Sequence, residues 1–174
     1  MTETQLSQYD GKVKPLFPPA ARYAGYPILG LGILALLSSL AQFLVSEVTL
    51  LQLLAGPVFI TMGYIMITSY EGIRLDTAFM RYRKYEWIAG FRHGEWLKLP
   101  NVVQITVAPF NAAYVIQDAV NPSFTVREDG LYRVLLSIEN SRIGIIAAVD
   151  KQDQALEKAN LLKQIFGTEV IFSS

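Results

Sequence analysis

Residues 23–70 read YAGYPILGLGILALLSSLAQFLVSEVTLLQLLAGPVFITMGYIMITSY, and this stretch decides the fold class. Its first part, Tyr23 to Ser46, contains no charged residue, and neither does its second part, Val48 to Tyr70. Glu47 alone separates the two parts. A helix needs roughly 20 apolar residues to cross the hydrocarbon core of a bilayer, because it rises about 1.5 Å per residue. The stretch therefore predicts two adjacent transmembrane helices, at about 23–46 and 48–70.

Two other interpretations of this stretch were weighed. A buried helical hairpin in a soluble protein is disfavoured, because charge-free runs of this length rarely serve a small core. A cleaved signal peptide is also disfavoured, because the first run exceeds a typical apolar signal region and a second run follows at once. We therefore expect a multi-pass membrane protein.

The basic residues on either side of the two runs predict the orientation. Those before the first run are Lys12, Lys14 and Arg22, and those after the second are Arg74, Arg81, Arg83 and Lys84. The connection between the runs carries only the acidic Glu47. The positive-inside rule then places both termini in the cytoplasm, with the tight turn on the far side.

Composition excludes several classes of function. The 174-residue chain is 52% hydrophobic and has 15 basic and 15 acidic residues, so its net charge is near zero. Nucleic-acid binding normally needs a marked basic excess and is not expected. The absence of cysteine excludes disulfides, thiolate metal sites and a cysteine nucleophile.

Residues 71–174 change to a strand-like pattern and then a helical one. The expected strands lie at about 71–76, 79–88, 95–99, 102–107, 132–138, 143–149 and 168–172. Between the last two lies an expected helix, with Asp150 as N-cap and Gly167 as the stop. Its apolar stripe at helical spacing consists of Ala155, Leu156, Ala159, Leu162, Ile165 and Phe166. The fold class is therefore α+β: a transmembrane hairpin, then an antiparallel sheet closed by one C-terminal helix.

Three motifs give a narrower resemblance. GIRLD at Gly72–Asp76, RYRKY at Arg81–Tyr85 and GFRHGEWLKLP at Gly90–Pro100 resemble a group of small bacterial membrane proteins. That uncharacterised family is similar in having two spans followed by a pleckstrin-homology-like (PH-like) domain. The resemblance implies a PH-like fold for residues 71–174 and a bacterial inner-membrane location, and it implies no catalytic residue.

Two segments give no regular pattern. Residues 1–22 are expected to form a cytoplasmic tail, with a disordered start and a proline-broken stretch, KVKPLFPPAARY, before the first span. Residues 110–130 match nothing recognisable, although Asn121-Pro122 and Asp129-Gly130 are turn signals.

Catalytic chemistry is not indicated. His93 is the single histidine, in a Gly-x-x-x-Gly turn where a solvated side chain is the simplest interpretation. No second histidine could help it to bind a metal, and no nucleophile–base spacing is recognisable. Phosphate-loop and dinucleotide fingerprints are missing as well. We expect no enzymatic activity, metal or cofactor.

The basic residues after the second run are the candidate binding site. Arg81 and Arg83 alternate onto one strand face and Arg74 precedes them, so these residues and Lys84 could converge near the first hairpin. PH domains that bind phosphoinositides carry basic residues in a similar place. The alternative is a cluster that only sets orientation in the membrane, or ordinary surface charge.

Gly56 and Gly63 are the candidate helix-packing residues. They are seven positions apart, hence on nearly one face of the second run, and small faces permit close helix approach. That face could pack against the first span or against another membrane protein.

Two hypotheses of function follow. The first is a non-enzymatic, membrane-anchored protein whose PH-like domain mediates protein or lipid interactions at the cytoplasmic face. The second is an accessory subunit of a larger membrane complex, with the spans packed on partner helices. The expected partners are membrane lipids and other membrane proteins, with a homo-oligomer left open.

Overall fold

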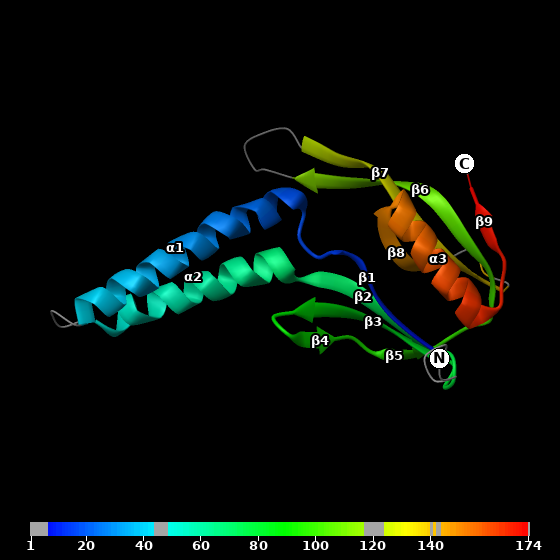
Figure 1. Ribbon diagram of the computed structural model, residues 1–174, viewed down its shortest axis with the longest axis horizontal. Helices are drawn as coiled ribbons and strands as arrows, with labels where there is room; N and C mark the ends of the chain where they lie inside the picture. The colour runs from blue at the N-terminus through cyan, green and yellow to red at the C-terminus, as the bar shows by residue number, and fades with distance from the viewer. Residues whose placement is uncertain (1–6, 44–48, 117–123, 140, 142–143, 174) are drawn as a thin grey trace. The chain divides into compact units, whose positions relative to one another are not determined.

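A computed structural model describes residues 7–43, 49–116, 124–139, 141 and 144–173. The described chain is α+β, and its elements follow one another as Figure 1 shows.

The chain divides into two compact units. The helical unit comprises Pro15–Tyr70 and Trp87–Arg92, and the sheet unit comprises the remainder. Each unit is taken by itself below.

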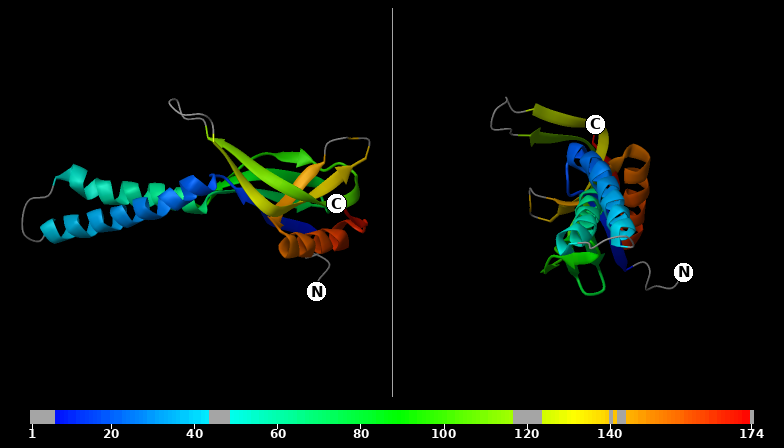
Figure 2. Two further views of the ribbon diagram at one scale, coloured as in Figure 1. Left: turned by 90° about the horizontal axis from the view of Figure 1, so that it is seen from above. Right: turned by 90° about the vertical axis from the view of Figure 1, so that its left-hand side faces the viewer.

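The helical unit is built on α1 (Pro19–Phe43) and α2 (Leu50–Thr68), which lie side by side in Figure 2. A capping box starts α2: the Gln52 backbone N–H donates to the Thr49 hydroxyl, and the Thr49 N–H donates to the Gln52 side chain. The prediction of two long apolar helices is confirmed. Helices of 25 and 19 residues are about 37 and 28 Å long.

The first sheet has five strands. They are β1 (Gln8–Pro15), β2 (Tyr70–Asp76), β3 (Arg81–Ile88), β4 (Phe91–His93) and β5 (Trp96–Lys98). The strand order is β1-β2-β3-β4, and β5 also pairs with β3, antiparallel. The strands predicted at 71–76, 79–88 and 95–99 are confirmed.

Strand β1 corrects the expectation of a tail over residues 1–22. Backbone N–H groups donate at both ends of its pairing with β2, from Leu16 to the Ser69 carbonyl (3.1 Å) and from Thr77 to the Ser7 carbonyl (2.9 Å), so the two strands run antiparallel. The α1–α2 hairpin is therefore inserted between two neighbouring strands of one sheet. Residues 1–6 lie outside the described part of the chain.

The second sheet has four strands in the order β8-β7-β6-β9. They are β6 (Val102–Ile116), β7 (Phe124–Ile138), β8 (Ile145–Lys151) and β9 (Val170–Phe172). Strands β6 to β8 pair antiparallel, as predicted, whereas β9 runs parallel to β6.

Both long strands of this sheet extend beyond their predicted bounds. β6 continues through Pro109 to Ile116, and β7 begins at Phe124, so much of the unassigned 110–130 segment is a β-hairpin. The Asp129-Gly130 turn signal falls inside β7, where Gly130 has a positive φ of 78°. The Asn121-Pro122 signal lies outside the described residues.

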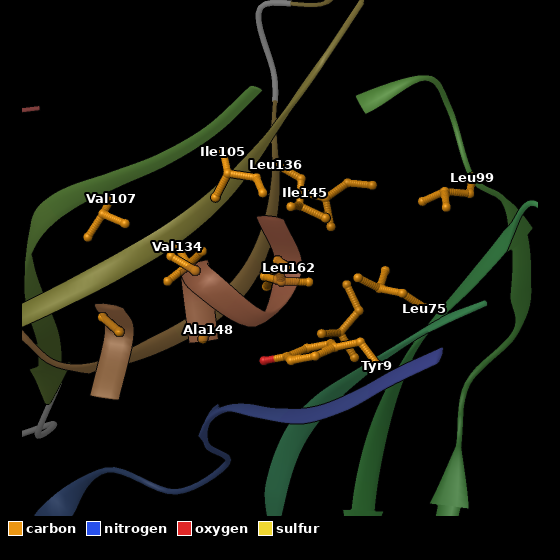
Figure 3. Close-up of a cluster of buried hydrophobic side chains, with 14 residues drawn as sticks. Tyr9, Leu75, Leu99, Ile105, Val107, Val134, Leu136, Ile145, Ala148 and Leu162 are labelled. Carbon is orange, nitrogen blue, oxygen red and sulfur yellow. The ribbon is translucent and has the colours of Figure 1, made fainter. Parts of the chain in front are cut away.

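The core of the sheet unit lies between the two sheets and α3 (Gln152–Phe166). In Figure 3, Leu162 of α3 lies among Val134 and Ile145 of the second sheet and Leu75 of the first. Of the predicted stripe, Ala155, Ala159 and Leu162 are fully buried, whereas Leu156, Ile165 and Phe166 are partly buried.

The predicted C-terminal end of α3 is confirmed, and the predicted N-cap is wrong. Gly167 ends the helix with φ 65°, and its N–H donates to the Lys163 carbonyl. The N-cap is Lys151 and not Asp150, because the second sheet extends over Asp150 and its carboxylate pairs with Lys158 of α3.

Candidate functional site

The predicted basic residues fall on both faces of the first sheet. Side chains alternate along a strand, so Arg81 and Arg83 of β3 share one face, and Lys84 takes the other. Tyr82, on the Lys84 face, packs against the hydrophobic core. Three arginines are therefore brought together on the outer face, and the expected convergence of Lys84 with them is wrong.

The outer-face arginines surround a tryptophan. Trp96 of β5 pairs with Arg83 of β3. The Arg81 guanidinium lies 4.5 Å from the centroid of the Trp96 ring, and the Arg74 guanidinium lies 6.0 Å from it. We call Arg74, Arg81, Arg83 and Trp96 the arginine–tryptophan cluster.

Neighbouring side chains hold the cluster. The Nε and Nη2 of Arg81 donate to one oxygen of Asp76, at 3.3 and 3.2 Å, and Asp76 is 2% exposed. Arg81 also lies 4.7 Å from the ring of Phe79, and Arg74 donates to the Gln8 side chain at 3.3 Å. These contacts use two of the five N–H donors of the Arg81 guanidinium and one of the five of the Arg74 guanidinium.

Lys84 instead lines a groove in the sheet unit. The groove has a volume of about 400 Å³, and we call it the sheet groove. Its lining residues are Val13, Lys14, Glu71, Gly72, Lys84, Tyr85, Glu86, His93, Gly94, Phe110, Ile146 and Val149. They come from both sheets, so neither sheet alone would form it.

The charged groove residues of β2 and β3 lie on strand faces whose other residues are apolar. Ile73 and Leu75 of β2 are fully buried in the core, and Glu71 is the next residue of β2 on that same face. The Glu71 carboxylate forms an ion pair with Lys14 at 3.2 Å. Lys84 and Glu86 likewise continue the face of β3 that begins with Tyr82.

Two glycines among the lining residues allow close contacts that a side chain would prevent. A side chain at Gly94 would collide with the carbonyl oxygen of Lys84, and one at Gly72 would collide with the ring of Tyr85. The Tyr85 hydroxyl donates to Asp10 at 2.6 Å, which fixes its ring over Gly72.

In the helical unit, Gly56 and Gly63 pack against α1. A Cβ on Gly63 would lie 2.7 Å from the Gly25 carbonyl oxygen and 2.7 Å from the Leu29 nitrogen. A Cβ on Gly56 would lie 2.8 Å from the Leu36 nitrogen, and one on Gly32 would lie 2.6 Å from the Ile60 nitrogen.

A serine extends this line of contact. The Ser39 hydroxyl, which is buried, lies 2.9 Å from the Gln52 carbonyl of α2 and 2.8 Å from the Ala35 carbonyl of its own helix. Gly25, Gly32 and Ser39 recur every seven residues on α1, and Gly56 and Gly63 face them from α2. The two candidate glycines therefore join the two helices to each other.

Most of the groove residues, notably Lys14, Glu71 and Glu86, were not predicted as site residues from the sequence. The His93 side chain is exposed, as expected, but His93 ends strand β4 and lines the groove. One signal was available: Glu71 shares the alternating face of Ile73 and Leu75, where a charged residue is unusual.

No protein-family model matches the sequence, and no curated protein matches it.

Proposed function

We propose that this is a non-enzymatic, membrane-anchored binding protein of the bacterial inner membrane. In this proposal α1 and α2 span the bilayer, and the sheet unit is a PH-like binding domain at the cytoplasmic face. The exposure of apolar side chains over the whole outer surface of the helix pair carries the proposal.

That surface is unlike the surface of a soluble helical hairpin. In the most apolar window of α1 17% of the residues are buried, and in that of α2 11% are buried. Exposed side chains include Leu31, Leu34, Leu37, Leu40, Phe43, Leu51, Leu54, Val58 and Met62. In water this continuous apolar surface would be strongly unfavourable, at about 25 cal/mol per Å², whereas hydrocarbon would solvate it.

The interior of the helix pair has the composition expected of membrane helices. Glycine and serine occupy the contact between α1 and α2, as they do where backbones approach closely in a bilayer. The core helix of a soluble protein would show the reverse arrangement, with large apolar side chains inside.

Aromatic residues gather at one end of the hairpin. Tyr23 and Tyr26 are exposed near the start of α1, and the Tyr70 ring after α2 stacks on Trp87 with centroids 5.3 Å apart. Because α1 and α2 are antiparallel, Gly25 lies beside Ile67, and these aromatics belong to the same end. Tyrosine and tryptophan favour the headgroup region, so this end suits a membrane interface.

The charge distribution supports cytoplasmic termini. Arg22 precedes the apolar part of α1, more basic residues lie on both sides of the hairpin, and the short connection carries Glu47. The arginine–tryptophan cluster adds to this positive charge without needing a ligand of its own. The ion pair between Arg81 and Asp76 lies at the end of β2 that is farther from α2. Asp76 is about 20 Å along the strand from Tyr70, the first residue of β2.

The glycines of α2 do not support the alternative proposal of an accessory subunit. Gly56 and Gly63 already contact α1, so they give no evidence for a partner helix. The PH-like interpretation is supported by the succession of antiparallel strands and a single C-terminal helix that packs on the core.

Cysteine accessibility tests the anchoring, because the chain has no cysteine of its own. We expect Phe43→Cys, at the end of α1, to react with a membrane-impermeant maleimide from outside intact spheroplasts. We expect Glu157→Cys, on the exposed side of α3, to react only in inverted vesicles. The cysteine-free parent is the control for labelling.

Alkaline carbonate washing completes the test. The protein should stay in the membrane pellet, because two spans anchor it. Extraction into the supernatant, or labelling of both positions from one side, would contradict a hairpin that spans the bilayer.

A further inference from the structure

The sheet groove holds charges of both signs, and some of these charged side chains have no partner among the described residues. Lys84 and Glu86 are two residues apart on one face of β3, hence about 7 Å apart along the strand. Among the described residues neither side chain forms a hydrogen bond or an ion pair. Glu71 pairs with Lys14 through one carboxylate oxygen, and its other oxygen has no partner within the described part of the chain.

The rest of the lining is apolar. Val13, Phe110, Ile146 and Val149 contribute to the same groove. Lys84 and Glu86 are exposed to solvent, so a ligand that carries an anion beside a cation can form charge-assisted hydrogen bonds with both of them. The groove therefore suits an amphiphile that carries an anion and a cation close to each other.

We propose that the sheet groove binds the headgroup of a phosphatidylethanolamine-type lipid. Lys84 and His93 contact the phosphate, and Glu86 and Glu71 accept hydrogen bonds from the ammonium group. The start of an acyl chain lies against Phe110, Ile146 and Val149. This assignment rests on the proposed membrane location, which supplies the ligand.

Headgroup chemistry explains the choice among phospholipids. A primary ammonium has three N–H donors for carboxylate oxygens, whereas the quaternary ammonium of phosphocholine has none. A phosphoglycerol headgroup carries no cation, so its phosphate could pair with Lys84 but Glu86 would be left without a cationic partner. A volume of about 400 Å³ also lies within the usual range of roughly 300–1,000 Å³ for small-molecule sites.

Two of the groove residues, Lys14 and Glu71, are close in sequence to the ends of the helices. Lys14 lies five residues before α1 begins at Pro19, and Glu71 lies three residues after α2 ends at Thr68. Five extended residues span at most about 18 Å. This chain length keeps Lys14 within about 18 Å of the start of α1, which in the proposed topology enters the bilayer.

Native mass spectrometry of the full chain in detergent tests the proposal. The probe is a short-chain phosphatidylethanolamine, compared with phosphatidylcholine and phosphatidylglycerol of the same chain length and with free phosphoethanolamine. We expect phosphatidylethanolamine to bind at least about tenfold more tightly than the other three.

Two charge-matched double variants separate the groove from other lipid contacts. Lys84→Gln with Glu86→Gln should weaken phosphatidylethanolamine binding at least about tenfold. Lys98→Gln with Glu95→Gln removes the same charges at exposed positions outside the groove lining and should leave binding unchanged. Circular dichroism checks that both variants fold.

Four results would overturn the proposal: equal binding by the two double variants, equal binding of phosphatidylglycerol, equal binding of free phosphoethanolamine, or a peptide retained in the groove after purification. Because the assay is done in detergent, a negative result concerns the groove alone. Failure of membrane anchoring would appear separately in the labelling and carbonate experiments.

Discussion

Tyr9 is the residue whose burial has the clearest energetic consequence. Its side chain is 4% exposed, and its hydroxyl has no hydrogen-bond partner among the described residues. The pKa of Tyr9 is raised from its ordinary value of 10.0 to about 12, chiefly by burial and additionally by the negative charges of Asp150 and Asp10. The neutral phenol is therefore favoured in the folded protein.

This shift predicts a loss of stability at alkaline pH. Below pH 10 Tyr9 is protonated in both states, so its contribution does not change. Between pH 10 and about 12 the unfolded state releases the proton first, and the free energy of unfolding should fall, by about 1 kcal/mol at pH 11. Urea unfolding followed by tryptophan fluorescence at pH 8 and pH 11 measures the fall.

Matched tyrosine variants isolate the effect from other alkaline titrations. Tyr9→Phe should lose about 1 kcal/mol less than the parent between the two pH values. Tyr23→Phe changes an exposed tyrosine and should behave like the parent. An unchanged pH dependence in Tyr9→Phe would show that Tyr9 is not responsible.

The packing of α1 against α2 depends on single glycine positions in the helix contact. Substituting Gly63 by Leu places a side chain against the backbone of α1, which cannot move aside as a flexible side chain could. Gly30 of α1 has open space around its missing Cβ, so Gly30→Leu is the matched control.

We expect Gly63→Leu to lower the thermal stability of the detergent-solubilised protein strongly, by at least about 2 kcal/mol of unfolding free energy. Gly30→Leu should change it by less than about 0.5 kcal/mol. Temperature-dependent circular dichroism of the helical signal provides the measurement. Equal stability of the two variants would mean that the close contact at Gly63 does not hold the helices together.

The elements also show how far the sequence could predict the fold. The two long apolar runs and the apolar stripe that Gly167 ends are strong local signals. The helices predicted from them, α1, α2 and α3, are all present. The signal for β1 is weak, because Gly11 interrupts the alternation of Tyr9 and Val13 in QYDGKVKP. The groove had no local signal, since Glu71, Lys84 and Phe110 meet only through the packing of separate strands.

For the whole molecule, the consequence of β1 is that the sheet unit is discontinuous in sequence. A protein beginning at residue 71 lacks β1 and exposes the inner edge of β2, including core residues Ile73 and Leu75. Replacing residues 17–68 by an Asn-Gly turn keeps β1 beside β2, because the Leu16 nitrogen and the Ser69 oxygen are already 3.1 Å apart.

We expect the Asn-Gly version to be soluble and monomeric, with cooperative unfolding. The version that begins at residue 71 should aggregate, because an open strand edge and an uncovered core favour association. Size-exclusion chromatography and circular dichroism distinguish the two. A folded monomer from residue 71 onward would show that β1 is dispensable.

The insertion of the hairpin between two neighbouring strands also constrains synthesis of the protein. β1 ends at Pro15 and β2 begins at Tyr70, a difference of 55 positions. At translation rates of about 5–20 residues per second, β1 leaves the ribosome about 3–11 s before its partner strand exists. During that interval both helices emerge, so β1 must wait unpaired until the second helix has been made, and the sheet cannot begin to close before the hairpin is complete.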